Sequence, residues 1–154
     1  MNHKILVTLS VLAVILLVAA RAFQPQPVEI PVTQREVKDQ GSLLEALKNK
    51  SVEIEGAKVE LGDTVEQSFF SVKGQVIKVN NSDVQAFEYA TPDAMESEAV
   101  LVSADGGSVG TNMVMWMATP HFFKAGRMIV LYVGDDAAVL DLLQGALGKQ
   151  FAGR

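Results

Sequence analysis

Hydrophobic positions gather most densely near the N-terminus, in the uncharged run Ile5–Ala20. The run is apolar on every side, so a small soluble domain could not easily cover it as a core helix. Its length falls between the span of about 20 apolar residues that crosses a bilayer and the core of about 7–15 residues in a signal peptide. Residues 1–22 are therefore predicted to form either a retained membrane anchor or a signal peptide that is cleaved after Ala22.

The charges around this run predict its orientation. Lys4 and the amino terminus precede the run, and a short positive end tends to stay in the cytoplasm. The rest of the chain is then expected outside the cytoplasm. It would be either part of a single-pass cell-membrane protein held through residues 5–23, or an exported protein.

Residues 23–41 form a proline-bearing stretch between the apolar run and the rest of the chain. Its prolines favour extended polyproline geometry and cannot donate to a sheet ladder; they are Pro25, Pro27 and Pro31. We therefore expect a tether that separates residues 1–22 from a domain over residues 42–154. The alternative is an edge strand over Val28–Val32.

Residues 42–90 change from a short helical pattern to several strand patterns. Ser42 and Glu45 have capping-box spacing, which predicts a helix of about two turns that ends near Lys50. Residues 51–61 alternate apolar and charged positions, as is typical of one or two half-exposed strands. Three further strands are expected in VEQSFFSV, QVIKVN and VQAFEYA, with turns at Lys73-Gly74 and Asn80–Ser82.

Residues 91–154 contain two helical patterns around an apolar hairpin. Thr91–Asp93 predicts a helix start, because it supplies a hydroxyl cap, a proline at the first helical position and an acid in the first turn. The apolar stretch 111–133 indicates a hairpin whose second strand is buried on both faces or nearly so. Gly134–Asp136 is expected to cap a last helix that ends at Gly148.

These elements predict an α+β domain, with an antiparallel sheet of about 5–6 strands and helices packed on one face. Phe69–Ile77 and Phe122–Ile129 resemble each other in sequence, and each is followed later by a helix that starts near an acid. This internal echo favours two β-β-α halves that arose by duplication. The N-terminal apolar run would precede the domain as a hydrophobic helix.

Composition narrows the classes of function. The chain has 13 basic and 18 acidic residues and a net charge of −5. An acidic chain without a basic cluster argues against nucleic acid and anionic lipid as partners. The sequence has no cysteine, which excludes disulfides, thiolate metal sites, thiol catalysis and a lipobox lipid anchor.

The segments FFSVKGQVIKVN, VQAFEYA and ATPHFFKAGRMIVLYVGDD resemble an uncharacterised family of exported, often lipoprotein-like bacterial proteins. The resemblance covers roughly residues 42–153. It implies an exported single domain, and it implies no catalytic residue because no activity is attached to that family. The chain departs from the family pattern in lacking the lipobox cysteine that such proteins often carry.

Met113, Met115 and Met117 alternate along the first strand of the predicted hairpin, so their sulfurs are expected on one side. Because methionines most often fill irregular core space, a core position is the favoured interpretation. One alternative is an adaptable apolar surface for a partner. The other is a Cu(I) site in which the thioethers act together with His121.

The sequence predicts no catalytic, cofactor-binding or metal-ligating residue. His121 is interpreted as a turn residue, because a zinc site or a serine-type triad would need partners that the sequence does not offer. Asp135 and Asp136 are sufficiently explained as helix caps. A contact surface is expected at residues of the types that dominate interface hot spots, with a core position as the alternative: Trp116, His121, Arg127 and Tyr132.

Together these patterns predict a non-enzymatic module, tethered to the membrane or exported, that binds a protein or a small apolar ligand in the cell envelope. No cofactor is expected. One alternative is an envelope enzyme or metal-handling protein that uses His121. The other is a purely structural envelope component.

Overall fold

The computed structural model describes residues 36–53 and 58–154. All of them belong to one structural unit. The predicted anchor or signal peptide over residues 1–22 and residues 23–35 of the predicted tether lie outside the described residues. The rest of the predicted tether is part of the domain, because Val37 is buried in its core and α2 begins at Gln40. Within the described ranges, no helix is both long enough and apolar enough to cross a membrane.

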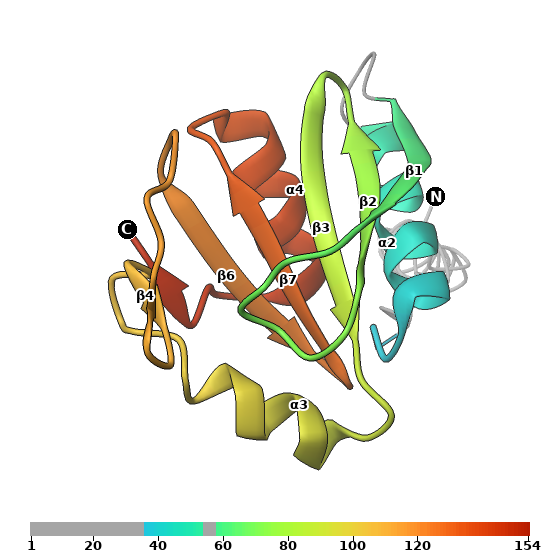
Figure 1. The fold of residues 1–154 in the computed structure, drawn as a ribbon. Coiled ribbons are helices and arrows are strands. Elements are labelled where there is room, and N and C mark those ends of the chain that lie inside the picture. The colour runs from blue at the N-terminus through green and yellow to red at the C-terminus, as the bar shows by residue number, and fades with distance from the viewer. Residues whose placement is uncertain (1–35, 54–57) are drawn as a thin grey trace, which may run out of the picture. The chain divides into compact units, whose positions relative to one another are not determined.

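Six strands form one antiparallel sheet in the order β1-β2-β3-β7-β6-β8 (Figure 1). This arrangement confirms the predicted α+β class and the antiparallel sheet. Strand β7 lies inside the sheet, and nearly all its side chains are buried, as the apolar stretch 111–133 predicted. The strands are β1 (Val59–Val65), β2 (Gly74–Val79), β3 (Ser82–Glu88), β6 (Pro120–Ala125), β7 (Met128–Val133) and β8 (Ala152–Gly153).

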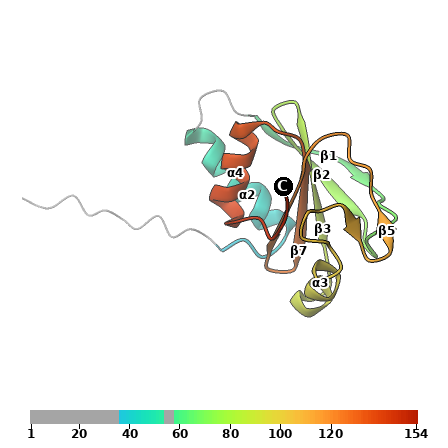
Figure 2. The ribbon, with the colours of Figure 1, turned by 90° about the vertical axis from the view of Figure 1, so that its left-hand side faces the viewer.

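Helices α2 (Gln40–Glu53) and α4 (Ala137–Leu147) pack together on one face of the sheet (Figure 2). Leu43 and Leu47 of α2 and Leu143 of α4 have no exposed surface. Together with the facing strand residues they form a layer that we call the helix-side core. Its strand residues include Ile77, Val79, Val84, Ala86, Phe123, Val130 and Tyr132.

A second core covers the opposite face of the sheet, and α3 (Pro92–Ala99) contributes Met95 and Ala99 to it. The expectation that helices pack on one face therefore holds for α2 and α4 and is wrong for α3. The reason lies in β6, where the neighbours Phe122 and Phe123 are both fully buried, each in a different core. Because adjacent strand residues point to opposite faces, such a strand needs cover on both.

Helix α2 begins earlier and ends later than the pattern predicted. Asp39 Oδ1 accepts from Ser42 N at 2.9 Å, and Ser42 Oγ accepts from Asp39 N at 3.0 Å, so the reciprocal cap joins Asp39 and Ser42 rather than Ser42 and Glu45. These hydrogen bonds hold the pKa of Asp39 below its usual value. Ser51, predicted to start a strand, lies in the last turn of α2 and is buried. It continues the stripe of Leu43 and Leu47 at helical spacing.

The stretch VEQSFFSV, residues 65–72, was expected to be a strand, but β1 ends at Val65 and residues 66–73 form turns and bends before β2. Phe70 packs into the second core, with its ring centroid 4.7 Å from that of Phe87. The similar pair Phe122 and Phe123 lies inside β6 instead. The two echoing segments therefore adopt different structures, since one Phe-Phe pair covers the sheet and the other belongs to it.

The stretch expected to be the first hairpin strand is extended only in part. Strand β5 (Asn112–Met113) pairs with β4 (Ser108–Val109), and residues 114–119 have no regular structure. The first strand of the hairpin that ends with β7 is β6, which starts at Pro120. Proline has no N–H to donate to the ladder, so it is confined to positions such as the first residue of a strand, where that hydrogen bond is not needed. His121 consequently lies in β6 and not in a turn.

The expected caps of the last two helices are confirmed. Thr91 caps α3 and its side chain accepts from Ala94 N at 3.1 Å, with Pro92 in the first turn. Asp136 caps α4 by accepting from Ala138 N at 2.9 Å. Gly148 ends α4 with a φ of 82°, a conformation that favours glycine.

Candidate functional site

The four residues of the predicted contact surface do not lie together. Trp116 packs on the second core, whereas Tyr132 belongs to the helix-side core. His121 lies opposite Tyr132 on the neighbouring strand, and their rings stack with centroids 6.0 Å apart. Arg127 lies in the turn between β6 and β7, where it pairs with Glu88. A single surface made of these four residues is therefore wrong.

Arg127 holds the fold together and does not form an open contact surface. Its guanidinium pairs with Glu88, whose second carboxylate oxygen accepts from Gln40 N at 3.0 Å. The backbone N–H of Arg127 donates to Lys38 O at 3.2 Å. These bonds fasten the start of α2 to the hairpin of β6 and β7, whereas Nε of Arg127 is buried and has no hydrogen-bond partner.

Trp116 is fastened to the domain through its indole ring. Its Nε1–H donates to Gly106 O at 2.6 Å, and the ring makes edge contacts with Phe69 and Phe122 at centroid distances of 5.8 and 5.9 Å. Two residues earlier, Val114 N donates to Gly107 O at 3.0 Å. The core alternative for Trp116 is thus the better description, and one side of the segment 113–117 faces inwards.

The other side of this segment carries three methionines that point into solvent. The exposed fractions are 91% for Met113, 98% for Met115 and 101% for Met117, whereas Val114 and Trp116 between them are partly buried. The core interpretation of the methionines is therefore wrong, because the inward positions of the segment belong to Val114 and Trp116. We call Met113, Met115 and Met117 the methionine strip.

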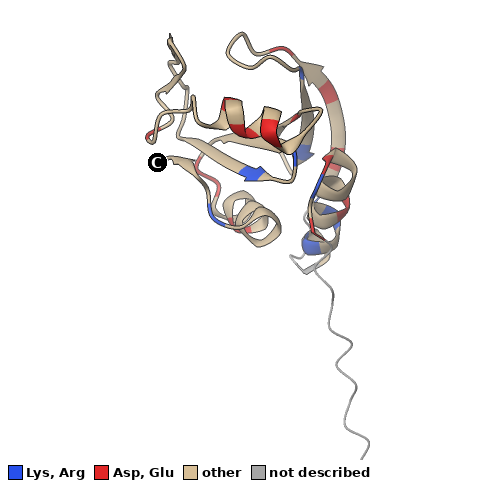
Figure 3. Ribbon diagram, turned by 90° about the horizontal axis from the view of Figure 1, so that it is seen from below, with Lys and Arg blue, Asp and Glu red and all other residues tan. Residues whose placement is uncertain are grey.

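The segment around the strip is apolar and poor in charge. Between residues 100 and 119 the only charged side chain is that of Asp105. Leu101 is 48% exposed and lies beside the hairpin of β4 and β5, because its carbonyl accepts from Gly110 N at 2.8 Å. The preceding helix α3 has acids but no Lys or Arg (Figure 3).

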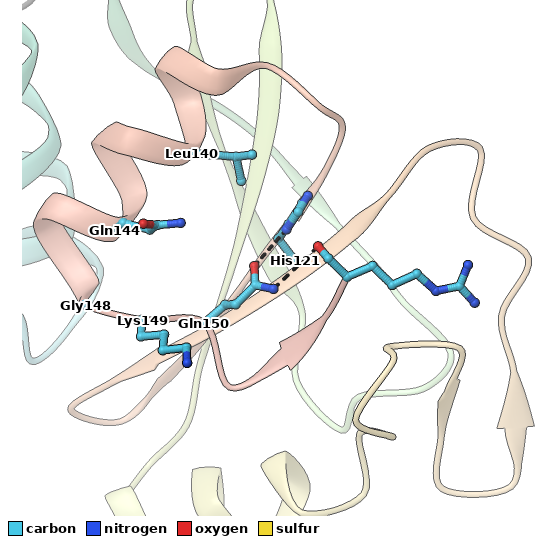
Figure 4. A pocket seen from close by; sticks show the side chains of 7 residues that line it. His121, Leu140, Gln144, Gly148, Lys149 and Gln150 are labelled. Atoms are coloured by element: carbon cyan, nitrogen blue, oxygen red, sulfur yellow. Dashed lines mark hydrogen bonds between the residues drawn. The ribbon is translucent and has the colours of Figure 1, made fainter.

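A pocket of about 560 Å³ lies between α4, the segment that follows it and β6 (Figure 4). His121 is its only buried lining residue, with 6% of its surface exposed, and so forms its floor. Most of the other lining residues are of polar or cationic types, none of them is acidic, and their exposed surface in the pocket is more apolar than polar. The lining residues are His121, Leu140, Gln144, Gly148, Lys149, Gln150 and Arg154.

Gln150 determines which ring nitrogen of His121 carries the hydrogen in the neutral form. Its amide oxygen lies 2.7 Å from His121 Nδ1, and its amide nitrogen donates to Arg154 O at 3.5 Å (Figure 4). With the amide oriented in this way, Nδ1 carries the hydrogen and donates to Oε1. In the neutral ring, Nε2 therefore holds a free lone pair and can only accept.

Nε2 of His121 is buried and has no hydrogen-bond partner in the structure. Buried polar atoms are nearly always paired, and in the described part of the chain this nitrogen shares its exceptional state with Nε of Arg127. Sequence reasoning named His121 and missed Gln144, Lys149 and Gln150. Nothing in the local pattern could have found them, since Gln150 meets His121 only through the fold.

A metal site has little support in the described part of the chain. No group of three or more His, Cys, Asp or Glu residues there could hold a metal ion. The alternative of thioethers acting together with His121 is not supported, because His121 stacks on Tyr132 of the helix-side core while the segment of the methionine strip packs on the second core through Trp116. Asp136 is accounted for by its cap on α4.

No family model, no curated protein and no solved structure matches this chain. The resemblance to exported, lipoprotein-like bacterial proteins therefore stays a prediction. Functional proposals rest on the geometry of the methionine strip.

Proposed function

We propose that this protein is a non-enzymatic module of the cell envelope that binds a protein partner through the methionine strip. The observation that carries the proposal is the full exposure of Met113, Met115 and Met117 on one side of a segment whose other side is fastened into the domain. Three neighbouring methionine side chains that stay in water forgo the free energy that burial of their apolar surface would provide. A partner that covers them would gain most of that free energy.

The chemistry of the strip favours a protein over a membrane surface. Methionine side chains are flexible and polarisable, and they are common on protein surfaces that adapt to apolar partners. Membrane-docking segments usually add Lys or Arg to attract anionic lipid. Residues 100–119 contain Asp105 and no base, and α3 next to them is acidic.

The sequence supports a location outside the cytoplasm. Residues 1–22 have the pattern of an anchor or signal peptide, and the positive start favours export of the residues after this segment. The proline-bearing stretch 23–35, which precedes the domain, would act as a spacer, and an extended polyproline form spans about 3.1 Å per residue. Held in this way, the domain could meet a partner at some distance from the bilayer.

Oxidation of methionine to its sulfoxide tests the proposal directly, because the reaction follows exposure. In the purified full chain, Met113, Met115 and Met117 should react like free methionine, whereas Met95 and Met128, which are 5% and 0% exposed, should react slowly. In native membranes the three strip residues should react several-fold more slowly than in the purified chain. Mass spectrometry of the oxidised peptides measures all five sites in one sample. Equal rates in both preparations would contradict a covered strip.

Two controls identify what covers the strip, and two variants test whether the strip itself is the contact. Protection in protein-free vesicles of the native lipids would assign the cover to lipid, and protection lost with a Cu(I) chelator would assign it to metal; either result contradicts a protein partner. Met115→Ser should reduce the protection of Met113 and Met117. Val52→Ser, at an 85% exposed position on α2, should leave it unchanged.

A further inference from the structure

We propose that the partner at the methionine strip contributes an extended peptide segment, which pairs with the backbone of Met113 and Met115 as an added strand. The segment is apolar and free of acidic side chains. This proposal rests on the proposed function, since it names the kind of contact that the protein partner makes there. It goes beyond a cover for the side chains, because it assigns the hydrogen bonds of the backbone as well.

The backbone groups of Met113 face away from the hairpin of β4 and β5. In an antiparallel ladder, pairs that exchange both hydrogen bonds alternate with pairs that exchange none. Val114 N donates to Gly107 O at 3.0 Å, so these two form a bonded pair. The next pair, Met113 opposite Ser108, is then one that exchanges none. Ser108 uses its outward carbonyl within the fold, where it accepts from Ser103 N at 2.9 Å. The N–H and C=O of Met113 point to the opposite, outer edge.

Met115 continues this outer edge. It follows Val114, whose N–H points inwards, so its own backbone groups point the same way as those of Met113. With exposed fractions of 91% for Met113 and 98% for Met115, both residues are open to solvent in backbone and side chain. No residue in the described part of the chain bonds to the N–H or C=O of Met115. Backbone donors and acceptors thus lie along one edge, beside the methionine side chains.

The edge at the methionine strip lacks the features that protect other sheet edges. Natural proteins usually protect a free edge with charged residues, proline or a bulge. Strand β1, an edge of the main sheet, contains Glu60 and Asp63, and its register shifts between Leu61 and Thr64. Residues 111–117 contain neither a charged residue nor a proline. An open apolar edge of this kind is one that a peptide strand can join.

The alternation of side chains defines the chemistry of the added segment. Every second side chain of an added strand would lie beside the methionines, and those between would face the side of Val114 and Trp116, which are partly buried. An apolar segment suits both sides. Acidic side chains are disfavoured, because Asp105 is the only charged residue between positions 100 and 119 and α3 beside them is acidic.

Proline at position 115 tests the hydrogen bonds separately from the side chains. Met115→Pro removes an N–H that no residue of the described chain accepts, and proline is tolerated where the N–H of an edge strand faces solvent. The domain should therefore unfold at the same urea concentration as in Met115→Leu. In native membranes, Met113 and Met117 should stay protected from oxidation in Met115→Leu and should react in Met115→Pro as fast as in the purified chain. Equal protection in both variants would overturn the added strand and leave the proposed function standing.

Hydrogen exchange gives a second readout, in the full chain without substitutions. In the purified chain the amide of Met115 should exchange freely, and in native membranes it should exchange about tenfold more slowly, the factor that one hydrogen bond supplies. The amide of Val114, bonded to Gly107 O, should be protected in both preparations and serves as the internal reference.

The outcomes of the exchange experiment separate the two proposals. Unchanged exchange of Met115 beside methionine side chains that are protected from oxidation would overturn the added strand alone. Slow exchange of Met115 in the purified chain would assign the strand to a second copy of this chain and overturn a strand from a partner protein. Methionine side chains that are unprotected in native membranes would contradict the proposed function itself.

Discussion

Tyr89 places a phenol hydroxyl inside the second core, beside a carboxylate. Its side chain is 3% exposed, and its hydroxyl donates to Glu98 Oε2 at 3.2 Å. Burial raises the pKa of Tyr89 above its usual value, and the negative charge of Glu98 raises it further. The folded protein therefore keeps this proton at a pH where an unfolded chain would lose it.

Stability should consequently fall in alkali through Tyr89. The unfolded tyrosine ionises near pH 10 while the folded one stays neutral, so the stabilisation is complete below about pH 10 and decreases above it, by up to about 1.4 kcal/mol per pH unit. Tyr89→Phe should cost about 1–2 kcal/mol near neutral pH, and this cost should shrink or reverse at about pH 11. Urea unfolding of both proteins at the two pH values measures it. A cost that does not change with pH would contradict the assignment.

At the scale of the elements, the turn between β6 and β7 packs against the start of α2. Gly126 has a φ of 57°, and a Cβ at this position would lie 2.4 Å from Lys38 Cα. Glycine is needed here for both its conformation and its size. Gly110, in the turn between β4 and β5, has a similar φ of 58° and no atom within 4 Å of its Cβ position.

Alanine at these two turns should separate the cost of conformation from the cost of contact. Gly110→Ala should lower the free energy of unfolding by about 1 kcal/mol, for backbone strain alone. Gly126→Ala should lower it by about 3 kcal/mol or more, because the methyl group also displaces α2. Urea unfolding followed by the fluorescence of Trp116, the only tryptophan, gives both values. Equal losses would mean that the contact with Lys38 is unimportant.

At the scale of the whole molecule, the sheet separates two surfaces of different chemistry. The helix side carries a pocket beside the buried imidazole of His121, and the other side carries exposed thioethers on a fastened segment. The proposed function requires that the domain lies in the compartment where its protein partner occurs.

That compartment can be tested with one cysteine, because the chain has none of its own. Val52→Cys, 85% exposed on α2, should react with a membrane-impermeant maleimide in intact cells whose outer layer is permeable. Lysis should not increase the labelling. Ala86→Cys, at a position with 0% exposure, should react only after denaturation. Labelling of Val52→Cys only after lysis would place the domain in the cytoplasm and contradict the predicted export.

Much of the fold followed from local patterns. The caps at Thr91 and Asp136, the turn after β2 and the buried character of β7 all come from neighbouring residues, whose spacing and turn chemistry act locally. The patterns failed where contacts distant in sequence decide. The segment 66–73 looks like a strand, but its phenylalanines serve as a cover for the sheet.

The candidate sites also depend partly on the local pattern of the sequence and partly on contacts between residues distant in sequence. The sequence alone determined that Met113, Met115 and Met117 share one side of an extended segment, because side chains alternate along such a backbone whatever surrounds it. Only the tertiary structure decided that this side meets water, since the second core takes up Val114 and Trp116 instead. It also decided that Gln150 reaches His121, because the chain after α4 returns to pair with β6. Alternation fixes which side chains point together, and long-range packing fixes what they meet.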